Sequence, residues 1–322
     1  MSSIRDRPKL GNISTTTQNS SVLSPIPFKS VKDLQSLLDD TTKTLQTIPI
    51  TDERWTDRLH ALITLQQISL GNSVTQPIFM QSISGPLRIA ISKQFSDARS
   101  SIIREVCTLL SILATRLGDK IERLQEYWIQ DLLKILSSVN SVMRESGNKT
   151  ILDLLRHCQC NRVLPSITQH LLNQRLSTHV RQYCAYYILI ILLAQCLTSP
   201  ESLQDKKIID NTSLEKPNQD FPYVHTNLSD NNLNILLQTL IVIPNDSSSE
   251  VRLIGRSCIF FLTGEFSIPP IWKSHAKFIT GQLSPNVRNT ITSEREELNR
   301  IIKTTIENVK NNTESKLPTK ST

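Results

Sequence analysis

Three residues in one short stretch have side chains that can bind zinc. His157, Cys158 and Cys160 lie in the tetrapeptide His-Cys-Gln-Cys, and imidazole and thiolate are the usual protein ligands of this metal. A structural zinc site needs a fourth ligand, usually within a second spaced pair, and the sequence supplies none at suitable spacing. We therefore predict no metal and no cofactor, and interpret this stretch as the end of a helix.

Signatures of catalysis are missing from the rest of the sequence. We find no glycine-rich phosphate loop, no nucleophile elbow, no paired metal-binding histidines and no kinase-like set of motifs. An enzyme would need catalytic residues scattered over distant segments. The sequence therefore favours a protein that is not an enzyme.

The strongest regularity is an arginine followed three residues later by a small residue. The pairs are Arg58 with Ala61, Arg104 with Cys107, Arg144 with Gly147, Arg181 with Cys184 and Arg252 with Gly255. Successive arginines are 46, 40, 37 and 71 residues apart, and periods of about 37 to 47 residues are typical of HEAT or armadillo repeats. We expect the small residues to allow close helix contact between stacked repeats. We expect Arg104, Arg144, Arg181 and Arg252 to stack between repeats or to bond to the carbonyls and carboxylates of the preceding turn, such as Asp97.

Composition and apolar periodicity agree with such repeats. The 322 residues are 38% hydrophobic but only 5% aromatic, which favours all-α packing. The expected helices cover 31–45, 51–68, 76–94, 97–117, 124–136, 142–157, 162–173, 180–197, 231–243, 251–262, 271–283 and 293–308. The predicted fold is an all-α HEAT-repeat solenoid of about six helix-turn-helix repeats.

The predicted domain layout has three parts. Residues 30–310 form the array, with a polar insertion at 198–230; residues 1–29 form a disordered, basic, Ser/Thr-rich tail; and residues 311–322 form a second disordered tail. The last helix, 293–308, is expected to cap the array. No run of eighteen apolar residues and no apolar leader are present, so we expect an intracellular protein with reduced cysteines and no membrane partner.

Net charge points only weakly to nucleic acid. The chain carries +7, but residues 1–29 hold +3 and residues 303–322 hold +2. Five of the seven net charges thus lie near the ends, and the helical body is almost balanced. A nucleic-acid partner is therefore the third hypothesis, behind two that involve proteins.

Four segments carry a family resemblance. ERWTDRLHALITL, FSDARSSIIREVCTLLSILATRLGDK, SSVNSVMRESGNKTILDLLRHC and LSTHVRQYCAYYILIILL resemble the TOG domains of the CLASP type, which are arrays of six HEAT repeats that bind tubulin. The resemblance covers about residues 50 to 285. It implies that the turn inside each repeat lies on one narrow edge and contacts tubulin.

The resemblance also implies a set of contact residues. They are Trp55 in the first turn, Asp97 and Arg99 in the second, Asn140 and Val142 in the third, Ser177 and His179 in the fourth, and Ser249 and Arg252 in the fifth. A large aromatic anchor and basic groups along an edge suit the acidic surface of tubulin. The chain departs from the best-binding members in having few lysines in its last three turns. Trp55 alternatively packs between the first two helices, and Arg252 alternatively serves only the fold.

Two protein-binding hypotheses follow. The first is a microtubule-associated protein that binds αβ-tubulin or microtubules, alongside other microtubule-associated proteins, in the cytoplasm and cytoskeleton, including the spindle or cilium. It would regulate microtubule dynamics or stability. The alternative is a HEAT-repeat scaffold that binds a protein or peptide on its helical face.

Overall fold

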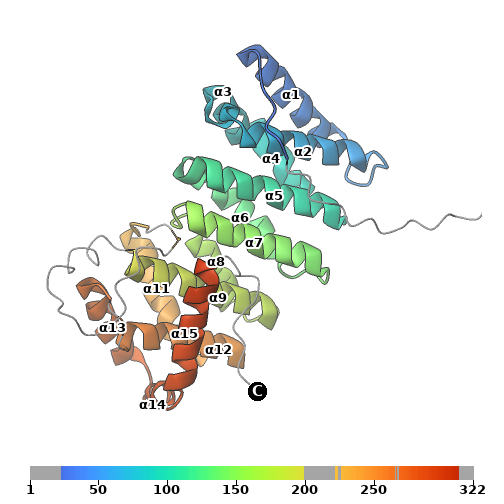
Figure 1. Ribbon diagram of the computed structural model, residues 1–322. Helices are drawn as coiled ribbons and strands as arrows, with labels where there is room; N and C mark the ends of the chain where they lie inside the picture. The colour runs from blue at the N-terminus through green and yellow to red at the C-terminus, as the bar shows by residue number, and fades with distance from the viewer. Residues whose placement is uncertain (1–22, 199–221, 224–225, 265, 267, 312–322) are drawn as a thin grey trace, which may run out of the picture.

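The computed structural model describes residues 23–198, 222–223, 226–264, 266 and 268–311, and within these ranges it contains helices and no strand. The helices are α1 (Val31–Thr47), α2 (Trp55–Leu70), α3 (Pro77–Ser84), α4 (Pro86–Gln94), α5 (Ser100–Leu117), α6 (Glu122–Ile135), α7 (Ser141–His157), α8 (Leu164–Leu172), α9 (Thr178–Leu197), α11 (Asp230–Val242), α12 (Ser249–Thr263), α13 (Pro270–Gln282), α14 (Pro285–Ser293) and α15 (Arg295–Lys310). Antiparallel pairs of these helices stack one below the next (Figure 1). The predicted all-α repeat solenoid is confirmed.

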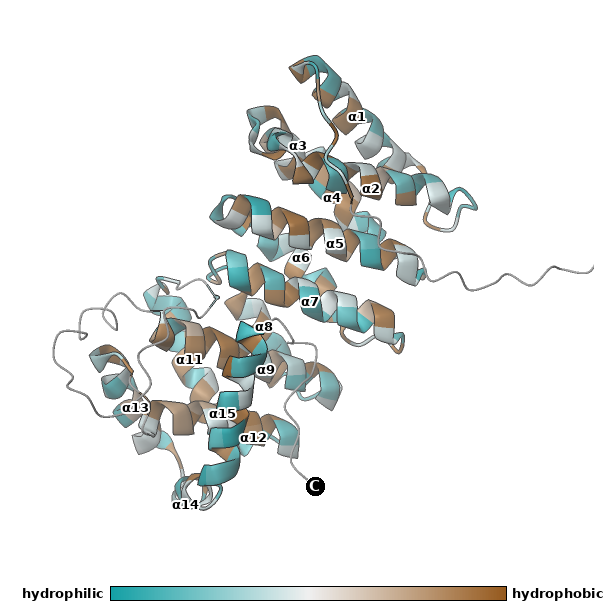
Figure 2. Ribbon diagram, in the orientation of Figure 1, coloured by the Kyte–Doolittle hydropathy of each residue, from teal (hydrophilic) through white to brown (hydrophobic). Residues whose placement is uncertain are grey.

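Five repeats are formed by helix pairs in chain order. The first helices are α1, α3 with α4, α6, α8 and α11, and the second helices are α2, α5, α7, α9 and α12. The second helices contact one another in the order α2, α5, α7, α9 and α12. Figure 2 shows their apolar faces turned toward the neighbouring layers, so the core is continuous along the stack.

Helix α9 is the most buried helix among the described ranges. It is long and apolar enough to cross a membrane, yet 94% of its 18-residue apolar stretch is buried inside the protein. Helices α7, α8 and α12 pack against it. Helix α9 is therefore a core helix, buried between the helices on either side of it.

The second repeat differs from the prediction in its first helix. The expected helix 76–94 is divided at Gly85–Pro86 into α3 and α4. Proline has no N–H to continue the helical bonding, and it occupies the first position of α4, where that N–H is not needed. Pro86 therefore explains why the helix is interrupted at this point.

The C-terminal helices also differ from the prediction. Helix α14 was not expected; Ser284 caps it by accepting a hydrogen bond from the Val287 N–H. Helix α15 does not cap the end of the stack but packs against α12 and crosses it (Figure 1). Its far end reaches the third repeat, where Arg156 Nη2 donates to the Val309 carbonyl at 3.4 Å.

The small residues of the repeat pattern permit close contact, but not always where predicted. A Cβ on Gly147 would lie 3.1 Å from Ile135 Cγ2, and one on Gly255 would lie 2.7 Å from Ile243 Cγ1. Both neighbours belong to the same repeat as the glycine. For these two positions the prediction of contact between stacked repeats is wrong, because the tight approach is inside the helix pair.

The predicted tails and insertion fall largely on residues 1–22, 199–221 and 312–322, outside the described residues. Residues 23–29 are extended, and the Ile26 N–H donates to the Gln67 carbonyl of α2 at 3.4 Å. At the end of the insertion, Thr226 accepts from the Cys160 N–H at 3.0 Å. The end of the predicted N-terminal tail and the end of the predicted insertion are therefore both hydrogen-bonded to the helical array.

Candidate protein-binding edge

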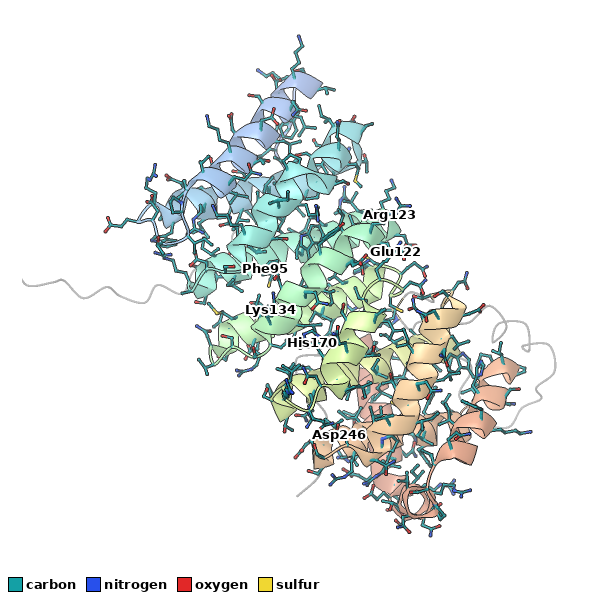
Figure 3. All side chains as sticks on the ribbon, turned by 180° about the vertical axis from the view of Figure 1, so that it is seen from behind. Phe95, Glu122, Arg123, Lys134, His170 and Asp246 are labelled. Carbon is teal, nitrogen blue, oxygen red and sulfur yellow. The ribbon has the colours of Figure 1, made fainter. Side chains whose placement is uncertain are left out.

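The turns inside the five repeats lie on one side of the stack. We define the turn edge as residues 48–54, 95–99, 136–140, 173–177 and 243–248, which join the first helix of each pair to the second, together with the two helix residues that flank each turn on either side. All of them lie at the right-hand ends of the helices in Figure 1. Seen from behind in Figure 3, Phe95, Lys134 and Asp246 follow this side, and Glu122 lies on the opposite one.

A buried ion pair joins the first two turns. Arg58 Nη2 lies 2.6 Å from Asp97 Oδ2, and both side chains are 0% exposed. The same Nη2 donates to the Ile50 carbonyl at 2.9 Å, and Nη1 donates to Gln94 Oε1 at 2.7 Å. Arg99 Nη1 also donates to the Ile50 carbonyl, at 3.0 Å. One arginine in the first repeat therefore fixes both turns relative to each other.

The fourth and fifth turns are joined in the same way. Arg181 Nη1 lies 2.6 Å from Asp246 Oδ2, and both side chains are almost fully buried. Gln174 Nε2 donates to the same carboxylate at 2.9 Å, and the Ser247 hydroxyl donates to Gln174 Oε1 at 2.7 Å. This end of the turn edge is therefore rigid as well.

Two other repeated arginines hold their own turns. Arg144 Nη1 donates to the Ser138 carbonyl at 2.8 Å, and Arg252 Nη1 donates to the Asp246 carbonyl at 2.7 Å. The structural role expected for these residues is present in both. The expected structural role is wrong for Arg104. This arginine is the fifth residue of its helix, whereas Arg144 and Arg252 are the fourth of theirs; it is exposed and donates to Glu105 at 3.1 Å.

Trp55 is the first residue of α2 and is half-buried. Its ring packs partly against the core, and the Arg99 guanidinium carbon lies 5.7 Å from the ring centroid. The indole therefore contacts the second turn and also keeps an exposed portion on the turn edge. A half-buried aromatic side chain loses little conformational freedom when a partner covers it.

Asp97 has no surface to offer a partner in this conformation. The resemblance places it among the contact residues, but its carboxylate is taken up by Arg58, by Arg99 Nη1 at 3.2 Å and by the Arg99 N–H at 2.8 Å. Its side chain therefore positions Arg99, which is partly exposed.

The predicted residues of the third and fourth turns occupy equivalent positions. Asn140 caps α7 by accepting from the Val142 N–H at 3.0 Å, and Ser177 caps α9 by accepting from the Val180 N–H at 3.4 Å. Val142 and His179 are each the second residue of their helix and are exposed. Burial of part of its ring, and secondarily the nearby Arg144, lower the pKa of His179.

In the fifth turn the helix cap is Ser248, which accepts from the Val251 N–H at 3.4 Å. Ser249 follows it and is exposed. Backbone and serine hydroxyl hydrogen bonds lower the pKa of Glu250. Arg252 is half-buried and is bonded to the turn, so only part of it faces solvent.

The prediction omitted three exposed residues of this side: Val139, Lys134 and Arg175. Val139 is 99% exposed in the third turn. The signal that could have identified it is an isolated apolar residue in the polar segment Ser-Ser-Val-Asn-Ser. Lys134, the second-last residue of α6, and Arg175, in the fourth turn, add positive charge to this side, although the last three turns contain few lysines. Lys134 pairs with Asp131 at 3.2 Å.

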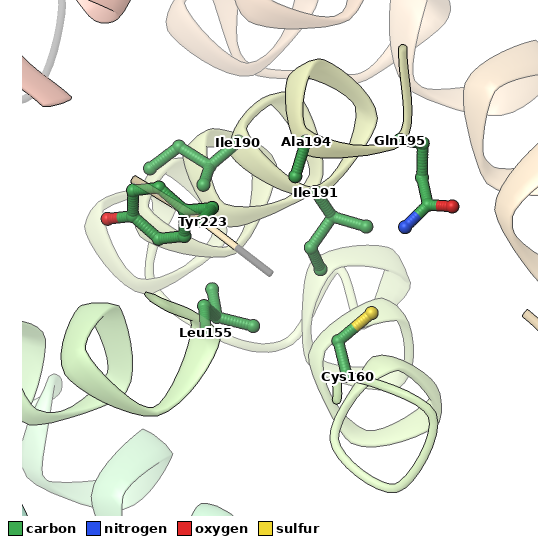
Figure 4. Close-up of a pocket in the computed structure, with 7 residues that line it drawn as sticks. All are labelled: Leu155, Cys160, Ile190, Ile191, Ala194, Gln195 and Tyr223. Carbon is green, nitrogen blue, oxygen red and sulfur yellow. The ribbon is translucent and has the colours of Figure 1, made fainter. Parts of the chain in front are cut away.

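A cavity of about 10 Å³ lies beside α9, with room for about one water molecule. Figure 4 shows the side chains that line it. Its lining residues are Leu155, Cys160, Ile190, Ile191, Ala194, Gln195 and Tyr223.

Within the described ranges, no group of three or more His, Cys, Asp or Glu side chains could hold a metal ion. Burial raises the pKa of Cys158 to about 12 and that of Cys160 to about 11.

Comparison with known proteins matches residues 35–292 to the family described as CLASP N terminal. An uncharacterized protein of Dictyostelium discoideum is 30% identical over 172 residues, which is 52% of this chain and 20% of that protein. The CLIP-associated protein of Arabidopsis thaliana is 28% identical over 173 residues, 53% of this chain and 11% of that protein. CLIP-associating protein 1-A of Xenopus laevis is 23% identical over 293 residues, 87% of this chain and 18% of that protein.

The chain therefore corresponds to about a fifth or less of the length of these relatives. The family match extends from within α1 to within α14 and covers all five turns. It also covers every residue that the resemblance had singled out. The chain belongs to the CLASP N-terminal family, and its helical array is a TOG domain of the CLASP type.

Proposed function

We propose that the chain binds αβ-tubulin or the microtubule lattice through the turn edge and so regulates microtubule dynamics or stability. The observation that carries this proposal is the location of Trp55 on the same side as all five turns, in a member of the CLASP N-terminal family. This function would place the protein in the cytoplasm on microtubules, including those of the spindle or cilium.

The charges of the turn edge support an acidic partner. Lys134 and Arg175 are exposed, and Arg99 and Arg144 are partly exposed, in or beside the second to fourth turns. Of these, Lys134 pairs with Asp131 at 3.2 Å. The carboxylates of Asp97 and Asp246 are buried in ion pairs and do not offset these charges at the surface. Complementary charge of this kind steers association and fixes the register of a complex.

Rigidity of the turn edge supports the same function. The Arg58–Asp97 and Arg181–Asp246 pairs hold the turns before any partner arrives. A preorganised surface loses less conformational entropy on binding than a mobile one. The array can therefore bind as a rigid unit.

Co-sedimentation with microtubules, together with size-exclusion chromatography with free αβ-tubulin at low salt, tests this function. We expect the chain to bind, and we expect Trp55→Ala to weaken binding at least tenfold. Tyr127→Ala is the matched control, because Tyr127 is an exposed aromatic residue on α6, outside the turn edge. No binding of the unmodified chain in either assay would remove the function and leave the fold intact.

A second candidate function, as a scaffold for another protein, is favoured by one observation. Ile89 on α4 and Tyr127 on α6 are 59% and 52% exposed, and these two first helices contact each other. The Arg88 guanidinium carbon lies 3.7 Å from the Tyr127 ring centroid. Loss of a partner on Ile89→Ser and Tyr127→Ala, with Trp55→Ala unaffected, would favour the scaffold.

A further inference from the structure

Helix α13 has one face in the core and another in solvent. Its buried residues Trp272, Ala276 and Ile279 recur every three or four positions, and the helix packs against α11 and α12. The outer face of such an amphipathic helix normally carries polar residues. On α13 that face displays Ile271 and Phe278, which are 55% and 47% exposed. Helix α13 therefore has apolar surface that the described part of the chain leaves uncovered.

The exposed residues of this face follow the spacing of a helix-packing seam. Ile271 and Phe278 lie seven residues apart, so they occupy nearly the same side of the helix, two turns from each other. Ser274 and Gly281 follow them by three residues each and are exposed as well. We call these four residues the α13 stripe. Alternate spacings of three and four residues are typical of the seam along which two helices pack.

Gly281 has no evident use in the fold of the chain. Glycine inside a helix is destabilising relative to alanine. Among the described glycines a positive φ occurs at Gly118 and not at Gly281, and a Cβ built on Gly281 would meet nothing within 4 Å. A missing side chain does, however, allow a neighbouring helix to approach the backbone closely. The glycine is therefore best explained by a partner that packs on this face.

The charges beside the α13 stripe are positive. Lys273 and Lys277 are exposed, and α13 contains no aspartate or glutamate. Helix α14, which follows it, carries Arg288 and no acidic residue. Two helices that both carry lysines beside their seams repel each other, whereas opposite charges attract. The α13 stripe thus suits an acidic helix and disfavours the same face of a second copy.

We propose that the α13 stripe binds an amphipathic helix of another protein, one whose apolar seam is flanked by aspartate or glutamate. The apolar residues of that helix cover Ile271 and Phe278, and its backbone approaches closest at Gly281. Its carboxylates face Lys273 and Lys277.

This site is separate from the turn edge. Figure 1 shows α13 on the opposite side of the stack from the five turns. A helix bound to the α13 stripe leaves the turn edge open, so the chain can bind two partners at once. The inference therefore does not rest on the proposed function.

The test uses the whole chain and two fluorescent helical peptides of about three heptads. Both carry leucine at the seam positions; one carries glutamate beside the seam and the other carries lysine, so like charges keep each peptide from pairing with itself. Fluorescence anisotropy measures the Kd of each complex. We expect the glutamate peptide to bind about tenfold more tightly than the lysine peptide.

Removal of the apolar side chains should weaken this binding. We expect Ile271→Ser with Phe278→Ser, the α13 double variant, to bind the glutamate peptide about thirtyfold more weakly. The matched control is Ile89→Ser with Tyr127→Ser, which removes an exposed isoleucine and an exposed aromatic ring from α4 and α6. The control should bind normally.

Two further variants test the close approach and the charge. Gly281→Leu, at a position where a Cβ meets no neighbour, should weaken binding of the glutamate peptide about tenfold. Lys273→Glu with Lys277→Glu should reverse the preference, so that the lysine peptide binds more tightly. Circular dichroism and the midpoint of thermal unfolding establish that every variant is folded.

Unchanged binding of the glutamate peptide by the α13 double variant, an equal loss in the control, or no binding of either peptide to the unmodified chain would overturn the inference. Binding to anionic phospholipid vesicles, or self-association in sedimentation velocity, that the double variant abolishes would also overturn it, because the occupant would be a membrane or a second copy. The double variant should bind αβ-tubulin as the unmodified chain does. Loss of αβ-tubulin in that variant would place α13 in the tubulin-binding surface and contradict a separate site.

Discussion

The guanidinium of Arg58 and the carboxylate of Asp97 lie 2.6 Å apart, with neither side chain exposed, although 39 residues separate them in the sequence. Arg181 and Asp246 repeat this relationship at 2.6 Å across 65 residues. In each case an arginine near the start of a second helix reaches the turn of the following repeat. The spacing of the turns along the edge therefore depends on buried charge as well as on apolar packing.

Breaking the first of these pairs should destabilise the array. Arg58→Met removes the guanidinium and leaves the Asp97 carboxylate buried with only Arg99 as a partner. We expect the free energy of unfolding to fall by about 3 kcal/mol, the lower end of the cost of breaking a buried ion pair, because the buried carboxylate keeps only its contacts with Arg99. Chemical denaturation of the purified chain measures this change.

The control for this prediction is Arg54→Met. Arg54 pairs with Asp52 at 2.9 Å in the first turn, but its side chain is 64% exposed, and exposed pairs contribute little. Similar unfolding midpoints for Arg54→Met and Arg58→Met would contradict the role assigned to the buried pair.

Two glycines in helices should respond oppositely to alanine. A Cβ on Gly255 would lie 2.7 Å from Ile243 Cγ1 and 2.9 Å from the Pro244 nitrogen, whereas one on Gly281 would meet nothing within 4 Å. We expect Gly255→Ala to destabilise by about 1–3 kcal/mol through overpacking. Gly281→Ala should be neutral or stabilising by up to about 1 kcal/mol through higher helix propensity. Thermal unfolding of both variants tests this, and a stable Gly255→Ala protein would show that the helix pair is looser than described.

Much of the architecture could be predicted because it is local. The recurring arginines mark the starts of the second helices, and Asn140 and Ser177, which the resemblance assigns to the third and fourth turns, directly precede α7 and α9 as their caps. The sequence did not indicate the direction of α15, because its amphipathic face is equally suited to the end of a stack and to its side. The contact of α15 with α12 depends on the three-dimensional arrangement.

The exposure of individual residues of the turn edge could not be predicted either, because it depends on side chains that are distant in the sequence. For Asp97 the sequence allows both a partner contact and a bond to an arginine, and only the structure shows that Arg58 of the preceding repeat buries it. Val139 and Leu176 precede equivalent helix caps, yet only Leu176 finds a neighbouring apolar surface. Sequence position identifies the turns, but the neighbours of each side chain decide whether it supports the fold or faces a partner.

The basic residues of the turn edge should act mainly on the rate of association. We expect Lys134→Gln combined with Arg175→Gln to slow association with αβ-tubulin about threefold at low salt, with a smaller effect as salt rises. Lys273→Gln with Lys277→Gln on α13 is the control of equal charge. Stopped-flow fluorescence measures the rates. Equal slowing by both variants would mean that net charge matters and its location does not.

The described cysteines should be inert in the native state. All six are buried and free, and burial raises the pKa of Cys107 and of Cys158 from 9.0 to about 12. Because the folded pKa exceeds the unfolded one, their contribution to stability is intact below about pH 9 and is lost as the pH rises toward 12. A thiol reagent at pH 8 should react fully only after denaturant is added; rapid reaction of the native chain would contradict this burial.

Hydroxyl-radical footprinting of the chain with and without αβ-tubulin tests the central claim most directly, because it reports which side chains become covered. We predict protection of Trp55, Val139, Val142 and His179 on the turn edge, with Tyr127 and Phe278 reacting equally in both samples. Protection of Tyr127 on α6, with Trp55 and Val139 still reactive in the complex, would contradict the assignment of the turn edge as the tubulin-binding surface.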